Sequence, residues 1–108
     1  LAHLDEHGFA VVAGAADPTE LSQGRELMWQ FLESHGQVRR DDVRTWEHES
    51  GWVGSADTGI IGGAGVGEAA CMWHLRLLPR VREAFAAVWG VGVDELLCSF
   101  DGAKDVMA

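Results

Sequence analysis

Apolar side chains recur at helical spacing in the first long stretch of the sequence, residues 18–35. Asp17-Pro18-Thr19-Glu20 is a typical helix start, because Asp17 accepts from free backbone donors and Pro18 has no amide hydrogen to leave unpaired. The residues that share one broad face of this helix are Leu21, Met28, Phe31, Leu32 and His35. The pattern predicts an amphipathic helix that ends at Gly36 and turns this face toward a core.

A second helical pattern begins at Pro79 and ends at Gly90. A short helix over residues 69–77 precedes it and is broken before Pro79, since proline disfavours helical geometry in the residue ahead of it. The apolar stripe of the second helix consists of Val81, Phe85, Val88 and Trp89, with Arg80, Arg82 and Glu83 left for solvent. We expect this stripe to pack against the core.

Two short apolar runs predict strands. Residues 1–7 have the pattern of a helix end that Gly8 stops, and residues 9–12 then form a short β-type run. Residues 96–100 form a continuous apolar run that predicts a strand buried on both faces. Asp101-Gly102 is a turn signal at the exit of that strand.

Periodicity disappears between these patterns, over residues 37–70. This window is rich in glycine and contains Trp46 and Trp52. A long irregular loop in a small domain is usually functional or disordered, and large rings in a solvated linker would expose apolar surface for no gain. We therefore expect an ordered, glycine-bent loop that the two tryptophans hold in place.

Length and charge narrow the class of protein. At 108 residues the chain has the size of one small domain, and its net charge of -9 would repel nucleic acid and anionic membranes. No segment has the pattern of a membrane span or a signal peptide. Cys71 and Cys98 have no metal-binding spacing, which indicates reduced thiols and a cytoplasmic protein, although a disulfide between them remains open.

One motif near the N-terminus matches a known pattern of metal ligands. His3-Leu4-Asp5 has the spacing that supplies two of the three protein ligands of non-haem iron. His7 would share a helix face with His3, as the paired histidines of zinc hydrolases do. A polar helix end with solvent-facing histidines fits the neighbouring acids better, so we assign no metal ligand to this chain.

Arg76 stands out because it lies in an otherwise apolar helix. An unpaired buried charge is very costly, so this arginine must reach solvent or an acid. Two alternatives stay open: an ion pair with an acid such as Asp101, or a position in the wall of a pocket that binds a carboxylate.

A set of short motifs follows one another in a particular order along the chain. They are Asp57-Thr58-Gly59-Ile60-Ile61, Gly65-Val66-Gly67, Trp73-His74-Leu75-Arg76, Pro79-x-Val81, Phe85, Val88-Trp89-Gly90, Leu96-Leu97 and Ser99-Phe100-Asp101-Gly102. This ordered set resembles the N-terminal part of phytanoyl-CoA dioxygenase-like proteins, which are iron(II)- and 2-oxoglutarate-dependent oxygenases.

The resemblance implies an α+β fold, in which this chain supplies the N-terminal helices and first strands of a double-stranded β-helix, or jelly roll. The barrel would be incomplete here. In such a protein a His-x-Asp and a distant His hold the iron, and an arginine or similar cation fixes the far carboxylate of 2-oxoglutarate. Those ligands follow the Ser-Phe-Asp-Gly strand, so His3-Leu4-Asp5 is in the wrong place to be that motif.

The resemblance also implies roles for particular residues. Ser99 and Asp101 would line the co-substrate or substrate cavity, and Ile60 and Ile61 would be walls on the substrate side. Arg76, in the second of its two alternatives above, would belong to the same cofactor-binding cavity. No catalytic residue and no metal ligand is assigned.

We expect the chain to be a single-domain fragment of a longer protein. Its parts are a helix-strand-helix entry over residues 1–36, the Gly/Trp-rich loop over 37–70, and helices leading into a barrel strand over 71–108. The parent would use iron(II) and 2-oxoglutarate to hydroxylate a small molecule, and the fragment would pack on the remainder of the barrel and be inactive alone. The alternative is a non-catalytic protein-interaction module on the same scaffold.

Overall fold

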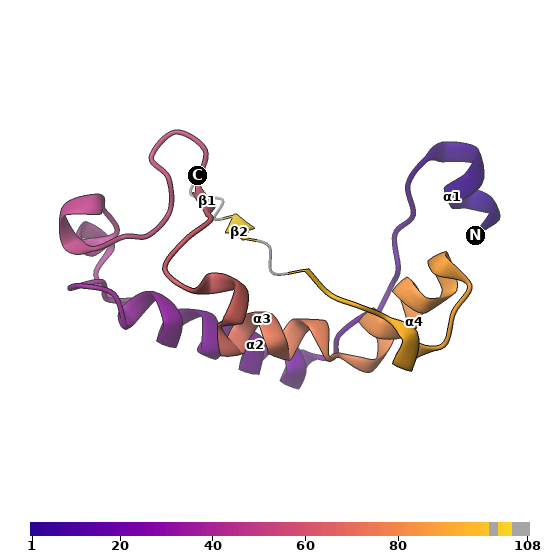
Figure 1. Ribbon diagram of the computed structural model, residues 1–108. Coiled ribbons are helices and arrows are strands. Elements are labelled where there is room, and N and C mark those ends of the chain that lie inside the picture. Colours follow the sequence, from indigo (N-terminus) through magenta and orange to yellow (C-terminus); the bar gives the residue numbers. More distant parts are fainter. Residues whose placement is uncertain (100–101, 105–108) are drawn as a thin grey trace.

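The computed structural model describes residues 1–99 and 102–104, most of which lie in helices and turns (Figure 1). The α-helices are α1 (Ala2–His7), α2 (Pro18–Glu33), α3 (Ala70–Arg76) and α4 (Pro79–Trp89). Short 3-10 helices are η1 (Val43–Thr45), η2 (His48–Ser50), η3 (Val66–Glu68) and η4 (Val93–Glu95). Two strands, β1 (Ile60–Ile61) and β2 (Ala103–Lys104), complete the described elements.

The molecule is elongated. Its Cα radius of gyration is 16.1 Å and its principal extents are 46 × 26 × 24 Å. A compact domain of this size has a radius of gyration of about 13 Å. Figure 1 shows the reason: α2 and α3 run along one side, the loops that carry β1 lie at one end, and α1 and α4 lie at the other.

Helix α2 begins with a reciprocal cap, as the sequence predicts. The Glu20 amide donates to Asp17 Oδ1 at 2.8 Å, and the Asp17 amide donates to Glu20 Oε2 at 2.8 Å. Two amides that lack helical partners are thereby satisfied. Glycines in the left-handed conformation end α1 at Gly8 and α4 at Gly90, which also confirms the predicted stops.

The hydrophobic core lies where α2 meets the loops of residues 37–70. Its buried members are Leu32, Val38, Ile61 and Val66, and the partly buried side chains packed on them are Met28, Trp29, Phe31, Trp46, Trp52, Val53, Met72 and Ala103. The predicted ordering of this loop by Trp46 and Trp52 is confirmed, because both rings pack on the core.

The predicted jelly-roll architecture is wrong for the described residues. They are mostly helical, and their strands form one two-stranded antiparallel pair with Ile60 opposite Lys104 and Ile61 opposite Ala103. The α+β class with the first strands of a barrel is therefore overturned. A barrel needs several strands of regular length, and β1 and β2 have two residues each.

Both predicted apolar strands are also wrong within the described part of the chain. Residues 9–12 and 96–99 have no strand structure, and Val11 and Leu97 are 87% and 99% exposed. Phe100, the last residue of the second predicted strand, lies outside the described residues. Apolar composition favours a strand only when a neighbouring strand is there to pair with it, and neither segment has one among the described elements.

The apolar stripe of α4 does not pack on the core. Phe85, Val88 and Trp89 are exposed, whereas Ala86 is the buried residue of the helix. Helix α4 packs against η4 and α3, and Arg82 Nη2 donates to the Val93 carbonyl oxygen of η4 at 3.2 Å. The spacing predicted the helix correctly, but the direction of its apolar face was wrong.

Candidate functional site

The residues that the sequence assigns to the pocket lie on three segments. Ile60 and Ile61 form β1, Arg76 is the last residue of α3, and Ser99 is exposed in the irregular segment after η4. Asp101 lies outside the described residues.

The antiparallel pair brings two of these segments together. Ile61 pairs with Ala103, so the loop that carries Ile60 lies beside the chain that follows Ser99. The two isoleucines differ in exposure: Ile61 is 2% exposed and belongs to the core, whereas Ile60 is 49% exposed. Of the two, Ile60 is the side chain that is open to a ligand.

Gly102 allows the segment before β2 to lie close to the backbone of Ile61 and Gly62. A Cβ atom at this position would lie 2.5 Å from the backbone oxygen of Ile61 and 3.3 Å from the Cα atom of Gly62. Any other residue would push the two segments apart, because the contact is with backbone that has no rotamer to change. In the sequence, Asp101-Gly102 is only a turn signal, because the close contact is made with residues distant along the chain.

Arg76 holds the loop that follows β1. Its Nη1 donates to the Gly67 carbonyl oxygen at 2.6 Å, and its guanidinium lies 5.2 Å from the ring centroid of Trp73. Trp73 Nε1 in turn donates to Glu68 Oε2 at 3.4 Å. The C-terminal part of α3 is therefore attached to the turn η3. The predicted partner Asp101 lies outside the described residues, so the ion pair stays a prediction.

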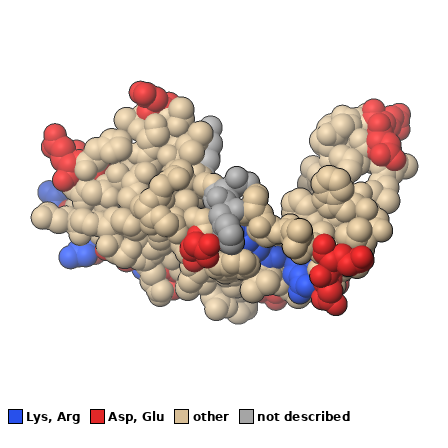
Figure 2. Space-filling view, in the orientation of Figure 1, with Lys and Arg blue, Asp and Glu red and all other residues tan. Residues whose placement is uncertain are grey.

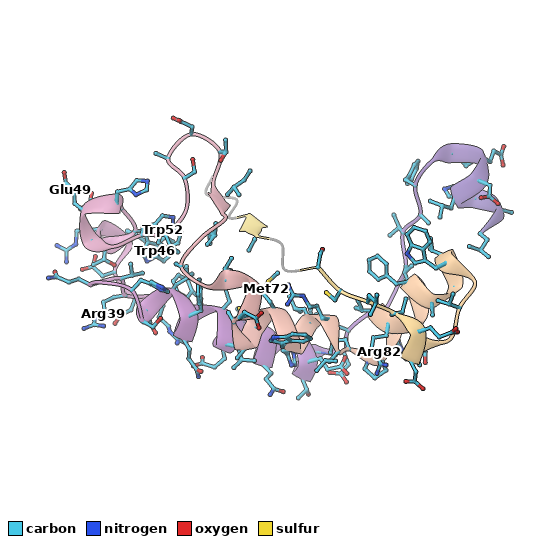
Figure 3. The ribbon with its side chains drawn as sticks, viewed as in Figure 1. Arg39, Trp46, Glu49, Trp52, Met72 and Arg82 are labelled. Atoms are coloured by element: carbon cyan, nitrogen blue, oxygen red, sulfur yellow. The ribbon has the colours of Figure 1, made fainter. Side chains whose placement is uncertain are left out.

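Three tryptophans form a cluster at the end of the molecule that carries η1 and η2. Trp29 and Trp46 have ring centroids 5.1 Å apart, and Trp46 stacks on Trp52 at 6.0 Å. Trp46 Nε1 donates to the Arg39 carbonyl oxygen at 2.7 Å. Figure 3 shows Trp46 and Trp52 side by side above α2. Since these rings pack on the buried core, they order the loop and do not form an open binding platform.

Arg40 links α2 to the loop through two carboxylates. Its Nη2 donates to Glu33 Oε2 at 2.9 Å and to Glu26 Oε1 at 3.2 Å. Hydrogen bonds from Arg40 lower the pKa of both Glu26 and Glu33, and the same bonds raise the pKa of Arg40. A surface groove along α2 includes Arg40 and Glu26, but the charge of this arginine is already neutralised there. Sequence reasoning missed this network, since no local pattern joins the loop to α2.

The histidines near the N-terminus do not form a metal site. The rings of His3 and His7 are in contact, tilted by 49° with centroids 4.4 Å apart, and His3 meets the Phe9 ring edge-on at 5.3 Å. Residues 1–99 and 102–104 contain no group of three or more His, Cys, Asp or Glu side chains arranged to hold a metal ion. The described residues therefore do not fit an iron site.

Both cysteines are free thiols. Cys71 is buried at the start of α3, and burial raises its pKa. Cys98 is exposed. In the described part of the chain, no helix combines the length and apolar character that crossing a bilayer requires.

Comparison with known proteins gives one short similarity. Over 40 residues, which are 37% of this chain, the sequence is 50% identical to Ava biosynthesis cluster protein O from Aspergillus versicolor. The matched region spans 12% of the length of that relative. No protein-family profile matches the chain. No solved structure matches it either.

Proposed function

We propose that this chain is a non-catalytic, helical part of an iron(II)- and 2-oxoglutarate-dependent oxygenase that hydroxylates a small molecule. Its role there is to position the loop of Ile60 at the rim of the substrate pocket. The ordered motifs from Asp57 to Gly102 support the resemblance on which this proposal rests. The Aspergillus relative is a biosynthesis cluster protein by name, which favours a role in biosynthesis.

The observation that carries the proposal is the pairing of β1 with β2. It places two segments side by side that the resemblance assigns to one pocket, although they lie far apart in the sequence. Ile60 offers a half-exposed apolar side chain at this place, and Ser99 is exposed shortly before the paired segment. Arg76 holds the far end of the same loop through the Gly67 carbonyl.

Iron and 2-oxoglutarate would be held by residues other than the described ones, which offer no metal site. We therefore assign no step of the reaction to this part of the chain. The compartment that we propose is the cytoplasm, which fits the two free thiols.

The test uses the complete polypeptide encoded by the reading frame that contains this sequence. We expect succinate release that depends on both iron(II) and 2-oxoglutarate. Ser99→Ala should raise the 2-oxoglutarate concentration for half-maximal release, and Ser22→Ala on the exposed side of α2 is the matched control. If the complete protein releases no succinate, the proposed oxygenase is wrong. If Ser99→Ala behaves like the control, only the role of Ser99 is lost.

A second candidate function is a non-catalytic protein-interaction module. The exposed apolar side chains of α4 favour it, because Trp89 is 73% exposed and Phe85 is 58% exposed. The reading frame separates the two candidates. A His-x-Asp followed by a later His and Arg supports the oxygenase, and a frame without them leaves the interaction module.

A further inference from the structure

Helix α1 is stabilised by few contacts. None of its residues is buried, and its last turn is closed by the Gly8 amide, which donates to the Leu4 carbonyl oxygen at 2.8 Å. In proteins, most of the stability of a helix comes from packing of an apolar face. Because α1 buries no such face, contacts between its exposed side chains decide whether it stays helical.

Three rings form the main side-chain contact of α1, and we call them the His3–His7–Phe9 cluster. The centroids of His3 and His7 are 4.4 Å apart, and the Phe9 centroid lies 5.3 Å from His3 and 6.4 Å from His7. The two histidines are neighbours because residues four apart share one helix face. Gly8 is left-handed and turns the chain, so that Phe9 reaches both rings. The cluster therefore depends on the helical state of α1.

The charged groups beside the cluster are mostly on α1 itself. Glu6 Oε2 lies 3.6 Å from His7 Nε2, and Asp5 is the other acid of the helix. Residues 8–16 contain no titratable side chain. In the described part of the chain, no hydrogen bond, ion pair or ring contact joins either histidine to another helix or strand.

Helix α4 lies at the same end of the molecule and also carries charges. Arg80 and Arg82 donate to the carbonyl oxygens of Gly14 and Val93, and Glu83 is exposed. Figure 2 shows acidic side chains over this end of the molecule. The cations of α4 are thus bonded elsewhere, and the nearest charges to the cluster are carboxylates.

Protonation changes the interaction within the cluster. Histidine ordinarily gains its positive charge between about pH 8 and pH 5. One charged ring is accommodated, since Glu6 lies beside His7 and the Phe9 ring attracts a cation. Two charged rings repel each other. At a separation of about 4 Å in water, this repulsion corresponds to about a fivefold change in an equilibrium constant.

We propose that α1 is an acid-sensitive element and that the His3–His7–Phe9 cluster is its sensor. At about pH 7.5 the neutral rings pack and α1 is helical. At about pH 5.5 both histidines are charged, the rings separate and α1 opens. The opening ends at Gly14, whose carbonyl oxygen accepts from Arg80 Nη1 at 2.6 Å and keeps the chain on α4. This inference does not depend on the proposed function.

The test follows the helix population of α1 in the complete polypeptide through the Cα chemical shifts of Ala2 and Leu4, which have no titratable side chain. At low ionic strength we expect the ratio of helical to open α1 to fall about fivefold between about pH 7.5 and pH 5.5. About 1 M NaCl should remove most of this change, because it screens exposed charges. The Cα shift of Leu32 in the core should stay constant and show that α2 remains folded.

Two variants separate charge from packing. His3→Phe keeps a ring beside His7 and Phe9 but cannot be charged, so α1 should stay helical at both pH values. His48→Gln removes an exposed imidazole from η2 and should keep the full response. An equal population of α1 at both pH values in the original protein would overturn the proposal. A response that survives in His3→Phe, or in about 1 M NaCl, would do so as well, since repulsion between the two rings would then not be its cause.

Discussion

His74 on α3 is hydrogen-bonded through Nε2 to the backbone carbonyl oxygen of Glu20 on α2, at 2.8 Å. A carbonyl only accepts, so Nε2 carries the proton and donates. This bond joins helices that are far apart in the sequence, and it fixes the His74 ring against Gly24. A Cβ atom at Gly24 would lie 3.2 Å from His74 Cδ2 and 3.5 Å from Leu75 Cδ2. Gly24 therefore sets how closely α2 and α3 approach.

The first prediction concerns Gly24→Ala. In an isolated helix this change is stabilising by roughly 1 kcal/mol. Here the new methyl group would lie 3.2 Å from the His74 ring, which must shift by a few tenths of an ångström and thereby strains its bond to the Glu20 carbonyl oxygen. We expect a net destabilisation of about 1 kcal/mol, measured by urea unfolding.

The control for this prediction is a double-mutant cycle. In a His74→Ala background the methyl group meets no ring, and Gly24→Ala should then stabilise the protein as helix propensity requires. Stabilisation by Gly24→Ala in the original background would show that the α2–α3 contact tolerates the methyl group.

The second prediction concerns Arg40 and pH. Arg40 lowers the pKa of Glu26 and Glu33 below their ordinary value of 4.5. A carboxyl group with a lowered folded-state pKa stabilises the fold above its unfolded pKa, and this contribution is lost as pH falls through the folded value. The stability difference between the original protein and Arg40→Met should therefore be present at pH 7 and decline below about pH 4.5.

Added salt should also reduce that difference, because the Arg40 network lies at the surface. The matched control is Arg25→Met, which removes an exposed arginine from α2, the helix that carries Glu26 and Glu33. If both variants show the same pH dependence of the urea midpoint, general charge and not the Arg40 network accounts for the effect.

A structural feature could be predicted from the sequence when the residues that form it lie close together along the chain. The start of α2 was predictable because Asp17 and Glu20 satisfy each other's amides within one turn. The strand predicted for residues 96–100 failed because a strand depends on a distant partner. The prediction that the apolar stripe of α4 packs on the core was wrong for a similar reason. Periodicity predicts that the helix has an apolar face, but tertiary contacts such as those with η4 decide where that face points.

In the candidate site, too, the sequence identified residues but not their tertiary contacts. Ile60 and Ile61 were identified through the resemblance, but their different exposure follows from packing against Val66 and Leu32 in the core. Arg76 was identified because it is a charge in an apolar helix, and its bond to Gly67 is a tertiary contact. The Arg40 network and the bond from His74 to Glu20 have no local sequence pattern, so they could not be found before the helices were placed.

The third prediction concerns the two thiols. Cys71 is 1% exposed and its pKa is raised by burial, whereas Cys98 is exposed. A disulfide reagent such as DTNB should react promptly with Cys98 in the native protein. It should react with Cys71 only after unfolding. Cys98→Ser should abolish the prompt phase and leave the slow one. A prompt phase that survives this substitution would mean that α3 opens readily.

The last prediction concerns Gly102, whose position beside Ile61 holds the candidate site together. In Gly102→Ala the added methyl group would lie 2.5 Å from the Ile61 carbonyl oxygen and 3.3 Å from the Gly62 Cα atom, and these backbone atoms have no rotamer that would make space. β2 must therefore move away from β1, which exposes Ile61 and costs about 1–3 kcal/mol. Urea unfolding and faster hydrogen exchange of the Ile61 amide measure the two effects.

Gly63→Ala is the matched control for Gly102→Ala, because a Cβ atom at Gly63 would meet nothing within 4 Å. The control should leave both stability and exchange unchanged. In the complete polypeptide, Gly102→Ala should also lower the rate of succinate release, since the pairing of β2 with β1 that supports the Ile60 loop is lost, and Gly63→Ala should not. Gly102→Ala could instead match the control in urea-unfolding stability and in hydrogen exchange of the Ile61 amide. In that case the pairing of β1 with β2 does not hold the segments around Ile60 and Ser99 together, and the observation that carries the proposed function is lost.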